Sequence, residues 1–136
     1  MHCGDTLLFD SDVINPSIKI DPSATLNLHL WIVVTEPQPT DQLCVIVSVT
    51  TLRKHSDTTV ILRSGDHPRI THDSVIRYAD AQIVDARALD GVLKIGKAKA
   101  REVCPPDMLK RIQNGIGTSA FVPKKIVTFC NECWKK

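Results

Sequence analysis

Short apolar runs separated by polar turns recur along the chain and predict a fold made mainly of β-strands. Residues 26–35 alternate between apolar and polar positions at first and then become a continuous β-branched run, which is typical of a strand that enters a core. Residues 43–51 form a second strong strand of the same kind. The segment 81–85 is either a strand of its own or a continuation of the one before it. Shorter strands are expected at residues 6–9, 58–62, 74–78, 81–85 and 125–129.

One segment late in the chain has the periodicity of a helix. Met108, Leu109 and Ile112 fall on one helical face, and the prolines just before them suit a first helical turn. The sequence therefore predicts a helix that opens at residues 105–112 and stops near Gly115.

The order of these segments predicts one small domain that is mainly β with one or two helices, in the α+β class. A meander of short strands with a late helix most easily closes as a small barrel or as a curled sheet with the helix against it. Residues 10–25 are polar and contain two prolines, so we expect a long loop there. We place the single domain at residues 1–136, with a core at about 4–129 and a C-terminal tail at 130–136.

Composition narrows the class of protein. The 136 residues are 43% hydrophobic and 24% charged, values that suit a folded domain rather than a disordered chain. The formal net charge is only +2, so a nucleic-acid site would have to be a local basic patch. No run approaches the roughly 20 apolar residues that span a bilayer, and the N-terminus lacks the features of a secretion signal. We therefore expect a cytoplasmic protein without a membrane partner, whose five cysteines are thiols.

Several short motifs follow one another in a fixed order. A Gly-Asp pair at residues 4–5 precedes an apolar strand, residues 29–35 are a Val-rich strand led by histidine, and residues 47–51 end in Thr-Thr. Residues 75–85 begin Val-Ile-Arg-Tyr and end Ile-Val-Asp, and a helix starts near Pro106. In this order the motifs resemble the MazF/PemK family of RNA-cutting toxins. That family has an opening Gly-Asp strand, Arg-Pro before a Val-rich strand that ends in Ser, a strand ending in Pro-x-Thr-Thr or Pro-x-Thr-Ser, a Val-Val-Arg…Ile-Asp segment and a closing helix.

The resemblance implies a fold, an activity and a set of partners. The fold would be the SH3-like small barrel of MazF/PemK proteins. The activity would be that of a metal-independent endoribonuclease, with no cofactor. The partners would be single-stranded RNA, an antitoxin protein and a second copy of the chain in a homodimer. The residues at the matching catalytic positions are His29, Thr50, Thr51 and Arg77.

Metal-free RNA cleavage needs a base for the 2′-hydroxyl, an acid for the leaving 5′-oxygen and a cation for the charge of the phosphorane. An imidazole titrates near neutral pH, so His29 could be the base or the acid, and the guanidinium of Arg77 could be the cation. The hydroxyls of Thr50 and Thr51 could hydrogen-bond the phosphate. Other polar side chains at predicted strand ends are expected to bind substrate at the rim of the groove. These are His55, Asp57, Asp66, His67, His72 and Ser74.

Two departures from the family pattern leave a second function open. The strand-leading arginine of the family is His29 here. The acidic residue that some members carry two positions after the matched arginine is Ala79, with Asp80 beside it. The alternative is a non-catalytic binding module for a protein or nucleic acid on the same barrel. In that case His29 is a half-buried strand residue and Arg77 forms a surface ion pair.

Three further clusters admit more than one interpretation. Four of the histidines and the aspartates beside them could hold a divalent metal in a metal-dependent hydrolase, although Asp66-His67-Pro68 is equally a turn. Cys130 and Cys133 are either half of a zinc site, with Cys104 as a third thiol, or two free thiols. The third cluster is basic and consists of Lys94, Lys97, Lys99 and Arg101. It could contact a phosphate backbone or be an ordinary solvated face.

Overall fold

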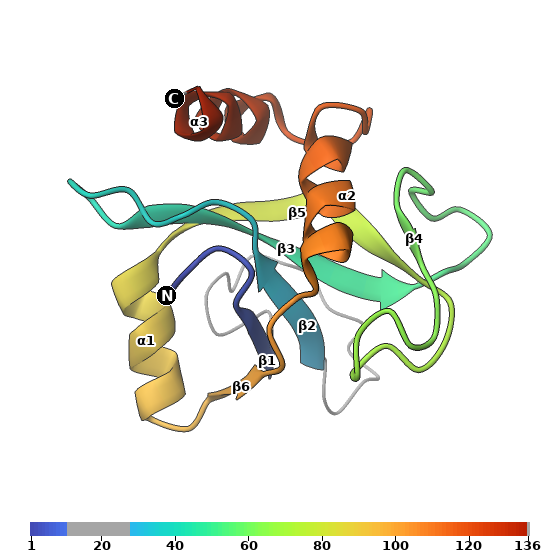
Figure 1. Ribbon diagram of the computed structural model, residues 1–136, viewed down its shortest axis with the longest axis horizontal. Helices are drawn as coiled ribbons and strands as arrows, with labels where there is room; N and C mark the ends of the chain where they lie inside the picture. The colour runs from blue at the N-terminus through green and yellow to red at the C-terminus, as the bar shows by residue number, and fades with distance from the viewer. Residues whose placement is uncertain (11–27, 136) are drawn as a thin grey trace.

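The computed structural model describes residues 1–10 and 28–135, so the loop expected at residues 10–25 lies almost wholly outside the described residues. The strands of the described part form one six-stranded antiparallel sheet in the order β4-β5-β3-β2-β1-β6, curled into a half-barrel (Figure 1). The expectation of a mainly β fold with a curled sheet and helices packed on it is confirmed. The elements in chain order are β1 (Thr6–Asp10), β2 (Leu28–Val33), β3 (Leu43–Thr51), β4 (Ile61–Leu62), β5 (Ser74–Asp85), α1 (Ala86–Lys94), β6 (Ala98–Arg101), α2 (Pro106–Ile116) and α3 (Lys124–Trp134).

Alternating side chains of the strands build one core on each face of the sheet, as the period of a strand requires. On β3, Val45, Val47 and Val49 belong to the core beneath α2 and α3. Cys44 and Ile46, which alternate with them along the strand, belong to the core beneath α1. Figure 1 shows α2 and α3 on one side of the sheet and α1 on the other. Both faces of the sheet are therefore covered, which explains why its strands are almost continuously apolar.

Strand β5 is long enough to include both strands expected at 74–78 and 81–85, so the second is a continuation of the first. It pairs with β3 over most of its length, with a register shift at Ile46/Ser48. The strand expected at 58–62 is reduced to Ile61–Leu62, and these two residues pair only with the first residues of β5. Within the described residues, β5 beyond Val75 therefore has a strand on one side only.

The C-terminal segment is a helix, and the strand expected at residues 125–129 is wrong. Ile126 and Cys130 lie four positions apart, as one helical face requires, and both are fully buried in the core beneath α2 and α3. The β-branched and aromatic residues between them favour a strand locally, but packing on the sheet selects the helix. The tail expected at residues 130–136 is also wrong up to Trp134, where α3 ends.

The helix expected from residue 105 is confirmed as α2, but α1 and β6 were not expected. Because of α1 and α3, the described part has three helices rather than one or two. The side chain of Asp85 caps α1 by accepting a hydrogen bond from the backbone N–H of Arg87 at 2.8 Å. Leu89 anchors the helix in its core. No helix in the described part is long and apolar enough to cross a membrane.

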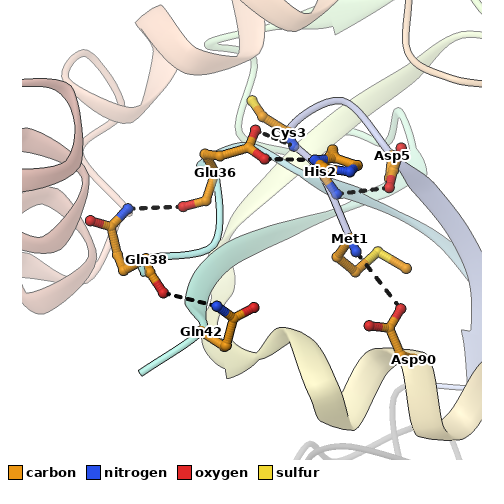
Figure 2. A network of polar contacts seen from close by, with 8 residues as sticks. All are labelled: Met1, His2, Cys3, Asp5, Glu36, Gln38, Gln42 and Asp90. Atoms are coloured by element: carbon orange, nitrogen blue, oxygen red, sulfur yellow. Dashed lines mark hydrogen bonds and ion pairs between the residues drawn. The ribbon is translucent and has the colours of Figure 1, made fainter. Parts of the chain in front are cut away.

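The N-terminal residues are fastened to the segment that follows β2 (Figure 2). The carboxylate of Glu36 accepts the backbone N–H of Cys3 at 3.0 Å and lies 2.8 Å from Nδ1 of His2. The hydrogen bond from Cys3, followed by that from His2, holds the pKa of Glu36 below its usual value. Gln38 Nε2 donates to the backbone carbonyl of Glu36 at 2.9 Å, so the network continues toward the turn before β3.

Candidate functional site

A cavity of about 460 Å³ lies where β3 ends, beside the edge of β5 that has no strand partner among the described residues. One wall is formed by residues 53–57, the loop after β3, and by Phe121, which lies between α2 and α3. We call this pocket as a whole the β3–β5 cavity. Its volume is within the range of about 300–1,000 Å³ that is usual for small-molecule sites. The opposite wall is the sheet itself, through Thr50, Thr51, Val75, Arg77, Tyr78 and Ala79.

The register of the sheet brings together residues that the sequence keeps apart. Thr50 pairs with Val75 across the antiparallel β3–β5 ladder. Side chains two positions apart on a strand share a face, so Arg77 lies on the same face as Val75 and Thr50. Thr50 and Arg77, predicted from two separate motifs, therefore line one cavity, which Thr51 also lines.

Arg77 is held in a specific orientation by its neighbour. Its side chain is 60% exposed, and its Nε lies 2.7 Å from Oδ2 of Asp80. The closest atom of the guanidinium to Asp80 is Nε, and the two terminal amino groups form no hydrogen bond with the described residues. Asp80, and not the residue at position 79, thus supplies the carboxylate beside the arginine. The guanidinium can still present a two-pronged donor to an anion.

The loop at residues 53–57 makes the cavity basic. Arg53, Lys54 and His55 are all exposed and line it. A hydrogen bond of 2.8 Å from the backbone N–H of Arg53 to Oγ of Ser56 closes the turn that presents them. With Arg77, the lining carries three permanent cations and a histidine, against the single carboxylate of Asp57.

Asp57 fastens the basic loop to the segment after α2. Its Oδ2 accepts a hydrogen bond from Oγ of Ser119 at 2.6 Å, and its Oδ1 accepts from the backbone and hydroxyl of Thr59. Burial raises the pKa of Asp57, but the hydrogen bonds from Ser119 and Thr59 outweigh it and hold the pKa below its usual value. Asp57 therefore stays ionised and links the two segments that form this wall of the cavity.

The interior of the cavity is partly aromatic. Tyr78 is fully buried, and its hydroxyl donates to the backbone carbonyl of Ile112 in α2 at 2.7 Å. Burial raises the pKa of this phenol, so Tyr78 stays neutral. Phe121, by contrast, is 60% exposed although it lines the cavity. Tyr78 thus packs behind the sheet wall, whereas most of the surface of Phe121 remains exposed.

Three of the other predicted site residues lie next to the cavity without lining it. His29 is half-buried on β2, and its Nδ1 lies 3.3 Å from the backbone carbonyl of Val49, one residue before Thr50. His72 is exposed, and its Nε2 lies 2.9 Å from Oγ1 of Thr51. Ser74 is buried, and its hydroxyl donates to the backbone carbonyl of His72 at 2.9 Å.

Asp66 and His67 have structural contacts away from the cavity. Asp66 accepts the backbone N–H of Arg63 at 2.8 Å, which confirms the interpretation of this segment as a turn. His67 is fully buried; its Nδ1 accepts the backbone N–H of Arg69 at 3.0 Å, so its Nε2 carries the proton that is donated to the carbonyl of Glu102 at 2.6 Å. This histidine therefore connects the turn to the segment after β6.

The alternative clusters do not assemble into a metal centre. In the described part of the chain, no group of three or more histidine, cysteine or acidic side chains is placed to hold a metal ion. The five cysteines form no disulfide in the described part of the chain, and burial raises the pKa of Cys130 to about 12 and that of Cys104 to about 11. Lys97 and Lys99 are exposed around β6, the edge strand at the opposite end of the sheet from β4.

Sequence reasoning identified five of the lining residues and missed others. Arg53 and Lys54 belonged to a recognisable charged turn, but nothing in the sequence placed that turn beside Arg77. Phe121 carried no signal, because it is a lone aromatic residue in a segment without periodicity.

No protein-family model and no curated protein matches the sequence.

Proposed function

We propose that the chain is a MazF/PemK-like endoribonuclease that cleaves single-stranded RNA without a metal. The observation that supports this most directly is the β3–β5 cavity, in which Thr50, Thr51 and Arg77, at the matching positions of the family, meet the basic loop at residues 53–57. On this proposal the curled sheet corresponds to the SH3-like barrel of the family. The protein would act in the cytoplasm as a homodimeric toxin controlled by an antitoxin protein.

Arg77 is the group that we assign to the phosphorane. Cleavage concentrates negative charge on the oxygens of the scissile phosphate, and preorganised donors stabilise that charge most. The terminal amino groups of Arg77 can donate to two of these oxygens, while Asp80 fixes the guanidinium through Nε. Arg53 and Lys54 bind the neighbouring phosphates, and the hydroxyls of Thr50 and Thr51 donate to the scissile group.

Proton transfer requires a base and an acid on opposite sides of that phosphate. The base removes the proton of the 2′-hydroxyl, whose oxygen attacks phosphorus and forms the new P–O bond. The bond to the 5′-oxygen breaks, and the acid protonates this oxygen, leaving a 2′,3′-cyclic phosphate and a 5′-hydroxyl. We assign His55, which lines the cavity, and His72, which is joined to Thr51, to these two roles. His29 contacts the backbone carbonyl of Val49, the residue before Thr50, and would support this part of β3.

A specific observation favours the alternative of a non-catalytic binding module. His29, which replaces the family's strand-leading arginine, contacts a backbone carbonyl and does not line the cavity. A basic cavity without a base and an acid in reach of one phosphate would still bind RNA, but it would not cut it.

Incubation of the purified protein with a long single-stranded RNA in EDTA tests the proposal. We expect discrete cuts with the wild type and a loss of at least about 100-fold in rate for Arg77→Ala, which is the usual cost of removing a transition-state donor. Arg87→Ala is the matched control, because Arg87 is also an exposed arginine, 2.7 Å from Asp85, but it lies on α1. Full activity of Arg77→Ala would refute the assignment of Arg77, and RNA binding without cuts would favour the binding module.

A further inference from the structure

An exposed aromatic ring stands in the wall of the β3–β5 cavity. Phe121 is 60% exposed, in contrast to Phe9, which is fully buried in the core beneath α1. Most exposed apolar side chains need no explanation when they are scattered singly. Phe121 differs because its ring lines a cavity whose other contributors include three cations.

The backbone that carries Phe121 is fixed by a chain of hydrogen bonds. Its N–H donates to Oγ of Ser119 at 3.1 Å, and the same hydroxyl donates to Asp57 at 2.6 Å. The backbone N–H of Ser119 donates to the carbonyl of Gly115 in α2 at 2.8 Å. The segment is therefore tied both to the end of α2 and to the basic loop, which limits how far the ring can move away from the cavity.

The cavity combines an aromatic surface with cations, which is the chemistry of a nucleotide. A base offers a flat π-surface that stacks on an aromatic side chain, and its phosphate is attracted to Arg53, Lys54 and Arg77. Neither an uncharged apolar ligand nor a simple inorganic anion would use both features. The cavity volume of about 460 Å³ suits a single unstacked nucleotide rather than a duplex.

We propose that Phe121 is a stacking platform for one base of a single-stranded RNA whose phosphates lie against Arg53, Lys54 and Arg77. This inference rests on the proposed function, because it names the part of the RNA that occupies the cavity. Stacking is tolerant of base identity, since every base has a π-face. Phe121 therefore adds affinity and holds the strand in place, while the cations set the position of its backbone.

Binding of two uncleavable probes separates stacking from charge. The first probe is a 2′-O-methyl hexa-adenylate, and the second is the abasic 2′-O-methyl hexamer with the same phosphates. We expect Phe121→Ala to weaken binding of the adenylate by about 5- to 150-fold, the range for loss of one stacked base, and to leave binding of the abasic probe unchanged. Phe121→Tyr should restore the affinity. Ile95→Ala is the matched control, because Ile95 is 66% exposed at the end of α1.

Each other outcome overturns the inference. Equal adenylate affinity of Phe121→Ala and the wild type would mean that no base stacks on the ring. An equal loss for both probes would mean that the substitution disturbs the basic loop. A change of oligomeric state by light scattering, with adenylate affinity per site unchanged, would assign Phe121 to a protein interface. Both probes lack the 2′-hydroxyl nucleophile, so their binding is measured separately from cleavage. Stacking without cleavage of RNA would refute the proposed enzyme and leave this inference standing. Cleavage of RNA without stacking would support the enzyme and refute the stacking role of Phe121.

Discussion

A methyl group at Gly115 would enter the tightest packing between α2 and the sheet. A Cβ on Gly115 would lie 2.6 Å from Cζ of Tyr78, closer still to its hydroxyl, and 2.9 Å from Cγ2 of Val60. Real Cβ atoms essentially never approach other atoms this closely, so something must shift. Tyr78 is fully buried and hydrogen-bonded to Ile112, and Val60 is buried in the same core, so neither can move without loss.

The expected cost of Gly115→Ala follows from three contributions. Overpacking of a core costs about 1–3 kcal/mol. Displacement of the Tyr78 hydroxyl from Ile112 costs about 0.5–1.5 kcal/mol more. The better helix propensity of alanine offsets about 1 kcal/mol of this. We therefore expect the free energy of unfolding to fall by about 2 kcal/mol, within a range of about 0.5–3.5 kcal/mol.

Urea unfolding measures this cost, and Gly91→Ala provides the control. Gly91 lies in α1, and a Cβ there would meet no atom within 4 Å. That variant should gain up to about 1 kcal/mol from helix propensity alone. At an m-value of about 2 kcal/mol/M, the Gly115→Ala midpoint should fall by about 1 M with an unchanged slope. A Gly115→Ala protein as stable as Gly91→Ala would refute the packing of α2 against Tyr78.

Two further predictions concern the contacts around the cavity and the turn. His67→Leu leaves the N–H of Arg69 without its partner and removes one of the two hydrogen bonds to the carbonyl of Glu102, which also accepts from Oγ1 of Thr6. It should therefore cost about 1–3 kcal/mol in urea unfolding, whereas a cost below about 0.5 kcal/mol would mean that water replaces the imidazole. The pKa of Asp57 is lower in the folded chain than its ordinary 3.8, so its hydrogen bond to Ser119 stabilises the fold above that pH and loses its effect as the pH falls through the folded pKa. Ser119→Ala should thus be less stable than the wild type at about pH 6 and approach it near pH 2, and a stability difference independent of pH would contradict this.

The strands of the sheet could be predicted because they bury side chains on both faces. Residues 43–49 are apolar at every position except Ser48, which is the pattern of a strand covered on both sides. The same composition misled at residues 125–129, where β-branched residues belong to a helix that packs through Ile126 and Cys130. Strand β6 had no signal at all, because an edge strand of alternating alanine and basic residues needs only one buried position, Ala98. Its existence depends on pairing with β1, which no local pattern encodes.

On the sheet wall of the candidate site the predicted residues came from strand motifs, whereas on the opposite wall only His55 and Asp57 were predicted. Thr50, Thr51 and Arg77 lie in motifs of regular strands, so their place followed from the order of the strands. The opposite wall depends on a contact between Asp57 and Ser119, which lie far apart in the sequence. Neither residue belongs to a motif, and a hydroxyl–carboxylate pair has no signature in a single sequence. The role of Phe121 follows from that contact and was therefore out of reach as well.

Gly115 connects the stability of the fold to the geometry of the cavity. Its missing side chain makes room for Tyr78, which supports the sheet wall, and its carbonyl accepts the N–H groups of Thr118 and Ser119. Ser119 in turn holds both Asp57 and the backbone of Phe121. A shift of α2 away from the sheet would therefore displace both walls of the cavity at the same time. For this reason the loss of stability in Gly115→Ala should be accompanied by weaker adenylate binding even under conditions where the variant is fully folded, whereas Gly91→Ala should leave binding unchanged.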